Sequence, residues 1–261
     1  METTWTLDPA PLALAALAAL LYAQAFARLR RRAPAHATWR HAFFFALGLA
    51  VSLLALVSPV DAVGEDQLLS AHMLQHLLLG DLGPLLLVLG TRGPLALFLL
   101  PAPALRVVAR SPLRRLARPR VALVAWLAAI GDWHVPAAYD AAIAHPALHV
   151  TEHACFALAG VLAWTQILRG PLTVGRRALF ALVLLVSSSV LAEVLVASPP
   201  LYPYYAAMRS RPFGWSAGQD QSHAALLMMA EQFATLATAI LFLVRAHVER
   251  VAPELTPHEV A

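Results

Sequence analysis

Two short histidine runs are the residues of this chain best suited to chemistry. The first run places His72 and His76 four residues apart, and the second places His145, His149 and His153 at the same interval. Both runs lie at the edges of strongly apolar segments, where a histidine costs free energy unless another group pairs with it. Histidines four apart share one face of an α-helix, so each run can offer two imidazoles to one metal ion.

The identity of the metal follows less directly from the ligands. Imidazole nitrogens suit both copper and zinc, and the neighbouring thioethers of Met228 and Met229 favour copper, although methionine in a helix is usually core filler. Haem needs axial ligands on opposite sides of its iron, whereas histidines four apart on one helix approach from the same side. We therefore expect copper, with zinc as the alternative. Neutral histidines that only bond backbone carbonyls are the competing interpretation of both runs.

Three further polar residues bear on the site. His134 follows Trp133 at the end of an apolar segment and is either a fifth metal ligand or part of an interfacial belt. Glu152 lies one residue away from the His149 and His153 stripe and could orient an imidazole. Asp81 is deeper in its segment, before a proline at which we expect a kink and a freed carbonyl. Its role stays open between a hydrogen-bonded or protonated group and one that moves ions.

The composition indicates that membrane helices position these residues. Hydrophobic residues make up 60% of the 261 and charged residues 13%, well outside the range of soluble domains. The single Cys155 excludes an internal disulfide and a paired-cysteine metal motif, and the absence of lysine excludes a retinal-type Schiff base. The net charge of +4 comes from arginines between apolar segments, so it does not indicate nucleic-acid binding.

Seven apolar stretches are candidates for spans of a bilayer core about 30 Å thick. They run over residues 11–27, 42–60, 68–90, 121–133, 147–168, 178–198 and 222–244. Residues 93–118 are apolar but interrupted by prolines, and we expect an interfacial segment there. The predicted fold is an all-α bundle of seven transmembrane helices that forms one domain over residues 1–261.

The arginines predict the orientation of this bundle. Alternate loops and the C-terminal tail contain all of them except Arg209 and Arg211, which lie on the opposite side. The positive-inside rule then places the N-terminus outside and the C-terminus in the cytoplasm. The acidic N-terminus lacks the positive region of a signal peptide, so we expect no cleavage. In this orientation both histidine runs lie in the outer half of the membrane.

Several short motifs together resemble the multi-pass bacterial CtaG family of cytochrome c oxidase assembly proteins. They are HMLQH at 72–76, WHVP at 133–136, HPALH at 145–149, SPPLYPYY at 198–205 and DQ at 220–221. The resemblance covers nearly the whole chain from the second to the seventh span. It implies a role in building haem–copper oxidase, with copper delivery as the expected chemistry. The family's histidine motifs map onto His72, His76, His134, His149 and His153, whereas the stretch around Asp81 is less apolar than expected.

The combined hypothesis is a copper-binding assembly factor, not an enzyme, in the multi-pass fraction of a bacterial cytoplasmic membrane. Its partners would be cytochrome c oxidase subunits and the lipid bilayer. A copper transporter is the alternative, for which Asp81 beside Pro84 is the only indication of an inward polar path. A haem-carrying electron-transfer protein is a third possibility.

Overall fold

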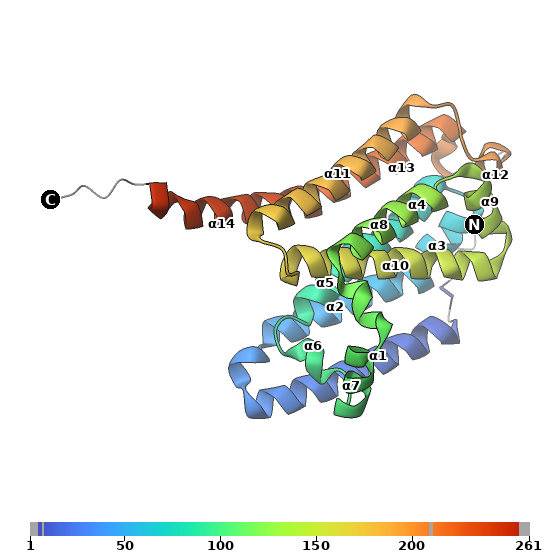
Figure 1. Ribbon diagram of the computed structural model, residues 1–261. Helices are drawn as coiled ribbons and strands as arrows, with labels where there is room; N and C mark the ends of the chain where they lie inside the picture. The colour runs from blue at the N-terminus through green and yellow to red at the C-terminus, as the bar shows by residue number, and fades with distance from the viewer. Residues whose placement is uncertain (1–4, 7, 209–210, 256–261) are drawn as a thin grey trace.

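A computed structural model describes residues 5–6, 8–208 and 211–255 of the chain. The described residues form helices and turns and contain no β-strand (Figure 1). The α-helices are α1 (Pro9–Arg32), α2 (Trp39–Val57), α3 (Pro59–Asp66), α4 (Leu69–Leu77), α5 (Gly83–Gly90), α6 (Leu95–Phe98), α7 (Ala102–Arg110), α8 (Pro119–Trp133), α9 (Pro136–Ala144), α10 (Pro146–Arg169), α11 (Val174–Ala197), α12 (Pro203–Ala206), α13 (Ala217–Gln232) and α14 (Thr238–Leu255). Five-residue π-helical turns join α4 to α5 over Leu78–Leu82 and α13 to α14 over Phe233–Ala237.

The helices have the length and composition of a multi-pass membrane protein. Among the described residues, six helical segments are long and apolar enough to cross a membrane, and a bent pair raises the number to seven. That pair is α8 and α9, which meet at an angle of 80°. Large apolar side chains such as Leu14, Phe43 and Leu241 are more than 60% exposed, as expected for residues that face lipid.

The fourth predicted span is not a single straight helix across the membrane. α8 has 15 residues, so at 1.5 Å per residue it covers roughly 22 Å, less than the bilayer core. The sharp bend after it coincides with Pro136 at the start of α9, because a proline cannot continue the hydrogen-bond ladder of the preceding helix. His134 therefore lies at a corner between two helices.

The segment from α4 to α5 forms the centre of the bundle. In its most apolar 18-residue stretch, 67% of the residues are buried inside the protein, whereas this share is 17–39% in the other candidate spans. Its backbone approaches α2 and α10 closely at glycines. A Cβ on Gly160 of α10 would lie 1.9 Å from the Gly80 carbonyl oxygen, and one on Gly90 would lie 2.5 Å from the Phe45 nitrogen. The helix that contains His72 and His76 is thus enclosed by its neighbours.

The predicted disruption before Pro84 takes the form of a π-helical turn. Pro84 has no N–H to donate to the Gly80 carbonyl, and the backbone widens over Leu78–Leu82. The freed Gly80 carbonyl faces Gly160 of α10. Asp81 lies within this turn and is 3% exposed. The turn therefore directs a carboxyl group into the interior of the bundle.

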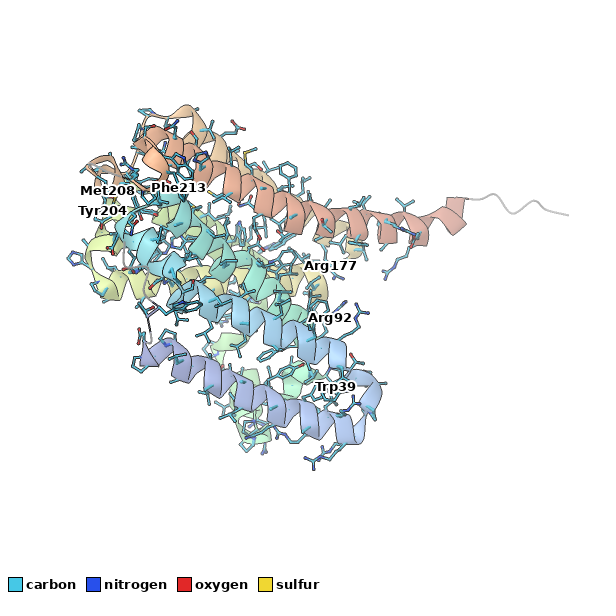
Figure 2. The ribbon with its side chains drawn as sticks, turned by 180° about the vertical axis from the view of Figure 1, so that it is seen from behind. Trp39, Arg92, Arg177, Tyr204, Met208 and Phe213 are labelled. Atoms are coloured by element: carbon cyan, nitrogen blue, oxygen red, sulfur yellow. The ribbon has the colours of Figure 1, made fainter. Side chains whose placement is uncertain are left out.

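The interfacial segment predicted over residues 93–118 consists of short helices, α6 and α7, and a 3₁₀ turn, none of which is long enough to span. The Arg28 guanidinium of α1 donates to the Phe98 carbonyl at 2.8 Å and ties this segment to α1. The two ends of the bundle also differ in composition. Figure 2 shows Arg92 and Arg177 at the end opposite Tyr204, Met208 and Phe213. The structure thus separates an arginine-rich end, which contains Arg92 and Arg177, from the end that contains Tyr204.

Candidate metal centre

Four histidines from two helices converge in the interior. His72 and His76 of α4 face His149 and His153 of α10, and one ligand atom from each lies within 4.8 Å of the others. We call these four residues the histidine cluster. Three of them are buried and His153 is partly buried. Sequence spacing placed each pair on one helical face, and the packing of α4 against α10 turns the two faces toward each other.

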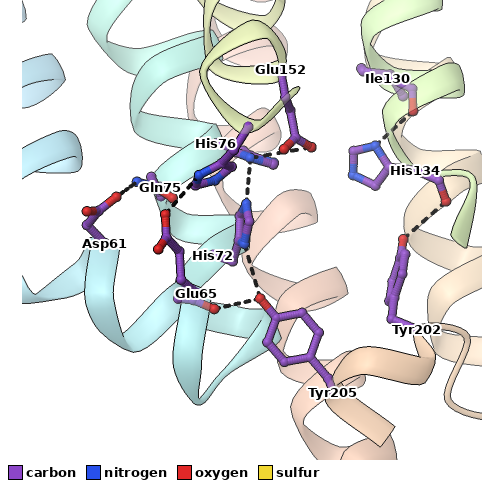
Figure 3. A network of polar contacts seen from close by, with 12 residues as sticks. Asp61, Glu65, His72, Gln75, His76, Ile130, His134, Glu152, Tyr202 and Tyr205 are labelled. Atoms are coloured by element: carbon purple, nitrogen blue, oxygen red, sulfur yellow. Dashed lines mark hydrogen bonds and ion pairs between the residues drawn. The ribbon is translucent and has the colours of Figure 1, made fainter. Parts of the chain in front are cut away.

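The Tyr205 hydroxyl fixes the orientation of His72. It donates to the Gly64 carbonyl at 2.5 Å and lies 3.1 Å from His72 Nδ1 (Figure 3). A hydroxyl has one proton to donate, so His72 Nδ1 must donate to the tyrosine oxygen. His72 Nε2 then presents its lone pair, and it lies 2.9 Å from His76 Nε2. The bond to Tyr205 thus selects the tautomer whose Nε2 can bind a metal.

His149 is held in the same way by a carboxylate. Its Nδ1 lies 2.8 Å from an oxygen of Glu65, which leaves Nε2 as the acceptor nitrogen. The Nε2 atoms of His149 and His153 are buried and have no hydrogen-bond partner among the described residues. A carboxylate that orients a histidine is a common arrangement behind a metal ligand, because it fixes the ring and raises its basicity. The cluster therefore contains nitrogens that are free to coordinate.

Glu152 is the second carboxyl group at the cluster. One of its oxygens lies 3.7 Å from His76 Nε2, and the residue is fully buried. This distance is longer than a hydrogen bond, so the role of orienting an imidazole stays a prediction. Neither oxygen of Glu152 has a hydrogen-bond partner among the described residues, so a cation bound at the cluster would be what stabilises its negative charge.

The structure places His134 apart from the histidine cluster. His134 Nδ1 donates to the Ile130 carbonyl at 2.8 Å, and its Nε2 is buried without a partner among the described residues. The Phe156 ring contacts His134 and His76, at centroid distances of 6.0 and 4.5 Å. His134 is not in the group of four ligand atoms. We predicted one site of five histidines, and the structure brings together the other four without His134.

His145 and His223 also lie outside the histidine cluster. His145 caps the start of α10 and is exposed, in agreement with its predicted interfacial position. The His223 ring packs on Trp215 at a centroid distance of 4.1 Å. Only the histidines one and two helical turns further into α10 reach the cluster.

The proline- and tyrosine-rich segment at 198–205 packs onto the site. Tyr202 and Tyr205 are 1% and 3% exposed, and their rings contact Tyr139 of α9. Tyr202 also donates to the His134 carbonyl at 3.3 Å (Figure 3). The sequence left two interpretations of this segment, a lid over the site or an interfacial anchor. Its contacts with His72 and His134 show that it covers the site.

Asp220 has a positioning role that the sequence did not reveal. Its two carboxylate oxygens accept from the backbone N–H groups of Leu69 and Ser70, at 2.8 and 3.0 Å. A helix begins with N–H groups that lack partners, and Asp220 caps α4 from a position about 150 residues away. The neighbouring Gln221 donates to the Leu195 carbonyl at 2.8 Å. Asp220 thus holds the first turn of α4, directly before His72, and Gln221 ties α13 to the end of α11.

Two acidic residues of α3, Asp61 and Glu65, lie beside the cluster. Glu65 is 41% exposed at its side chain, so the residue that holds His149 also reaches the surface. Asp61 lies near it and accepts from Gln75 Nε2 at 2.5 Å. Burial, and to a smaller extent Glu65, raises the pKa of the Asp61 carboxyl from 3.8 to about 6, against the opposing hydrogen bond from Gln75. A cation that approaches from this side meets negative potential before it meets the histidines.

Comparison with known proteins identifies a family that this chain matches. Residues 20–249 match the sequence model of one family, described as cytochrome c oxidase caa3 assembly factor. Neither the curated proteins nor the solved structures contain a match. The matched range contains α2 to α13 and all four residues of the histidine cluster. The chain therefore belongs to the caa3-type CtaG family of cytochrome c oxidase assembly factors.

Proposed function

We propose that this protein binds copper at the histidine cluster, in the outer half of a bacterial cytoplasmic membrane, and passes it to a cytochrome c oxidase subunit. The observation that supports this proposal is the convergence of His72, His76, His149 and His153 within 4.8 Å. Family membership supports cytochrome c oxidase as the acceptor. In this proposal the protein is a metallochaperone without catalytic activity of its own.

The dimensions of the histidine cluster suit one ion. Two nitrogens bound about 2.0 Å from a tetrahedral ion are about 3.3 Å apart. The cluster holds one pair at 2.9 Å and all its ligand atoms within 4.8 Å, so side-chain adjustments of about 1 Å would close it on a metal. Four imidazoles without a thiolate form a site that can release its ion. Copper ranks above zinc in affinity for such nitrogen ligands, which supports copper as the cargo.

The exposed carboxylate of Glu65 provides a route for transfer. It contacts His149 at 2.8 Å and reaches the surface beside α3. The opposite direction is closed by packed apolar side chains such as Trp164 and Leu184, and the Arg169 guanidinium binds the Thr91 carbonyl at 2.7 Å. A fixed positive charge opposes the passage of a cation. This arrangement favours handover at the outer end over transport across the membrane.

The decisive experiment measures the metal content of the detergent-purified protein by mass spectrometry after anaerobic loading with copper. We expect stoichiometric copper in the unaltered protein and its loss in a His72→Ala/His76→Ala variant. The matched control is His145→Ala/His223→Ala, which removes two histidines outside the cluster and should retain the copper. Zinc in place of copper would contradict the proposal that copper is the cargo. Equal copper in all three proteins would contradict the proposal that the histidine cluster binds it.

Transfer is tested with the same samples. Copper-loaded protein mixed with copper-free oxidase should lose its copper to that enzyme, and the double variant should supply none. The transport alternative predicts instead that proteoliposomes accumulate copper and that Asp81→Asn abolishes the uptake. We expect no accumulation above that of protein-free vesicles.

A further inference from the structure

Two carboxyl groups from different helices meet on the side of the cluster away from α3. Asp81 lies in the π-helical turn after α4, and Glu231 lies in the last turn of α13. Their side chains interact directly, and the oxygens of Glu231 are buried. No arginine or histidine in the described part of the chain forms an ion pair with either group. Two adjacent negative charges in this interior would be very costly, so one of the carboxyl groups must be protonated.

The hydrogen-bond donors around the pair indicate which group is protonated. The Trp164 indole donates to Asp81 Oδ1 at 2.5 Å. The single proton of the Thr235 hydroxyl is shared between two acceptors at 3.2 Å, Asp81 Oδ2 and the backbone carbonyl of Glu231. An indole N–H can only donate, so it requires an acceptor oxygen. Neither oxygen of Glu231 has a donor among the described residues. The donor-only indole therefore stabilises Asp81 as the carboxylate and leaves Glu231 as the neutral acid.

A mostly apolar cavity, to which a few polar side chains contribute, adjoins Asp81. It has a volume of about 40 Å³, and Asp81, Gln232, His76 and His134 are among the residues that line it. Gln232 and His134 are 3% and 7% exposed, and each presents a buried atom, Oε1 or Nε2, without a partner in the described part of the structure. A cavity of this size accommodates a water molecule, which needs polar partners of this kind. Water there would connect Asp81 with the base of the histidine cluster.

Both π-helical turns of the described structure contribute to this arrangement. One contains Asp81, and the other, over Phe233–Ala237, contains Thr235 and directly follows Glu231 and Gln232. A π-helical turn interrupts the regular hydrogen bonding of an α-helix, and such turns are found frequently at functional sites. Here the two turns bring polar side chains of two central spans into contact.

We propose that Asp81 and Glu231 form a one-proton carboxyl pair beside a hydrated cavity, in which Glu231 holds the proton and Asp81 the negative charge. The carboxyl pair is thus a second site, and it binds a proton. The cavity lined by His76 connects this pair with the histidine cluster. The Asp81 charge would then stabilise a cation bound at the histidine cluster. This last step rests on the proposed function, whereas the protonation of the pair does not.

Infrared spectroscopy of the purified protein at neutral pH tests the proton assignment without any metal. We expect a carboxylic-acid C=O band that disappears in Glu231→Gln and persists in Asp81→Asn. The control is Glu249→Gln, because Glu249 is exposed and pairs with Arg245 at 2.7 Å. Each comparison uses the difference between the spectra of two proteins, so the absorption of the other buried acids cancels. A band that survives in Glu231→Gln, or disappears in Asp81→Asn alone, would overturn the proposal.

Zinc titration of the same variants tests the electrostatic step. Glu231→Gln replaces a neutral acid with a neutral amide, and the zinc affinity should change by less than about twofold, whereas Asp81→Asn removes the charge and should weaken binding on the order of tenfold. Elution of each variant as a single species on size exclusion verifies that it is folded. Equal affinities in all proteins would overturn this step. If the unaltered protein bound no metal, the proposed function would fail while the infrared result still stood.

Discussion

At the scale of single residues, the histidine cluster depends on groups that fix the tautomers of its imidazoles. Tyr205 and Glu65 each bind an Nδ1 atom, at 3.1 and 2.8 Å, and so leave the Nε2 atoms of His72 and His149 available. Such partners contribute to affinity because a free imidazole must otherwise lose rotational freedom and choose a tautomer when metal binds. The cluster is therefore partly organised before an ion arrives.

Tyr205→Phe should weaken metal binding without unfolding the protein. The substitution removes the oxygen that accepts from His72 Nδ1 and retains the packing of the ring on Tyr139. Loss of such a partner typically lowers metal affinity by about 10- to 100-fold. Competition titration with a zinc chelator measures the change. Tyr204→Phe is the control, since Tyr204 contributes its backbone N–H to Asp140 and keeps it in the variant. Equal affinities in both variants would show that the hydroxyl does not organise the site.

The folding stability should depend on pH through Asp61. The pKa of this carboxyl is about 6 in the folded protein, above its usual value of 3.8, chiefly because of burial. Between these values the folded state binds the proton more tightly than the unfolded state, so stability falls as pH rises from about 4 to about 6. Asp61 is partly exposed, and solvent screening limits the effect to less than about 1 kcal/mol.

Thermal denaturation in detergent across this pH range measures the effect of Asp61. Asp61→Asn should flatten the dependence of Tm on pH and leave Tm near that of the unaltered protein at low pH. Asp66→Asn, at an exposed position on the same helix, is the control and should change neither. A slope that persists unchanged in Asp61→Asn would assign the pH dependence to another group.

At the scale of the helices, the position of the cluster is set by close backbone contacts around α4 and α5. The helix α10 approaches the π-helical turn so closely that Gly160 has no room for a side chain. This contact sets how far His149 and His153 lie from the α4 histidines. The Asp220 cap fixes the other end of α4 at Leu69. A contact at each end of the helix thus determines the distance between the two histidine pairs.

Gly160→Ala should destabilise the bundle. Its Cβ would lie 1.9 Å from the Gly80 carbonyl oxygen, so α10 would have to move away, and overpacking of this kind costs roughly 1–3 kcal/mol or more. Gly131→Ala is the matched control, because a Cβ at that helical position meets nothing within 4 Å. Size exclusion after heating would show early aggregation of Gly160→Ala only. Equal heat resistance of both variants would mean that the helices separate without cost.

At the scale of the whole molecule, the two ends of the bundle differ in charge, and this difference predicts the orientation in the membrane. The arginine-rich end contains Arg92 and Arg177, and the opposite end contains Tyr204 of the tyrosine-rich segment (Figure 2). By the positive-inside rule we predict that the arginine-rich end faces the cytoplasm. The histidine cluster then lies near the outer face, where a handover to an oxidase subunit would occur.

Cysteine labelling of intact cells tests this orientation. In a Cys155→Ser background, Asp66→Cys should react with a membrane-impermeant maleimide, because Asp66 lies at the end predicted to be outside. Ala35→Cys, between α1 and α2, should react only after the cells are permeabilised. Both side chains are exposed, so access depends on the side of the membrane. The reverse pattern would place the N-terminus in the cytoplasm and the cluster near the inner face.

The sequence by itself determined the features that depend on local periodicity and composition. The lengths of its apolar segments predicted a helical multi-pass protein, and the spacing of four placed His72 and His76, and His149 and His153, on single helical faces. It also placed a disruption before Pro84, although not the π-helical form that the turn takes. These properties follow from the helical periodicity of each segment, which does not depend on contacts with other helices.

Only the tertiary structure decided how those faces are turned and what holds them. Helical periodicity states which residues share a face, but rotation about the helix axis is set by packing against other helices. The partners of the cluster are therefore distant in sequence, with Tyr205 on His72 and Asp220 at the start of α4. The same packing leaves His134 beyond Phe156, because α8 ends at the bend before α9.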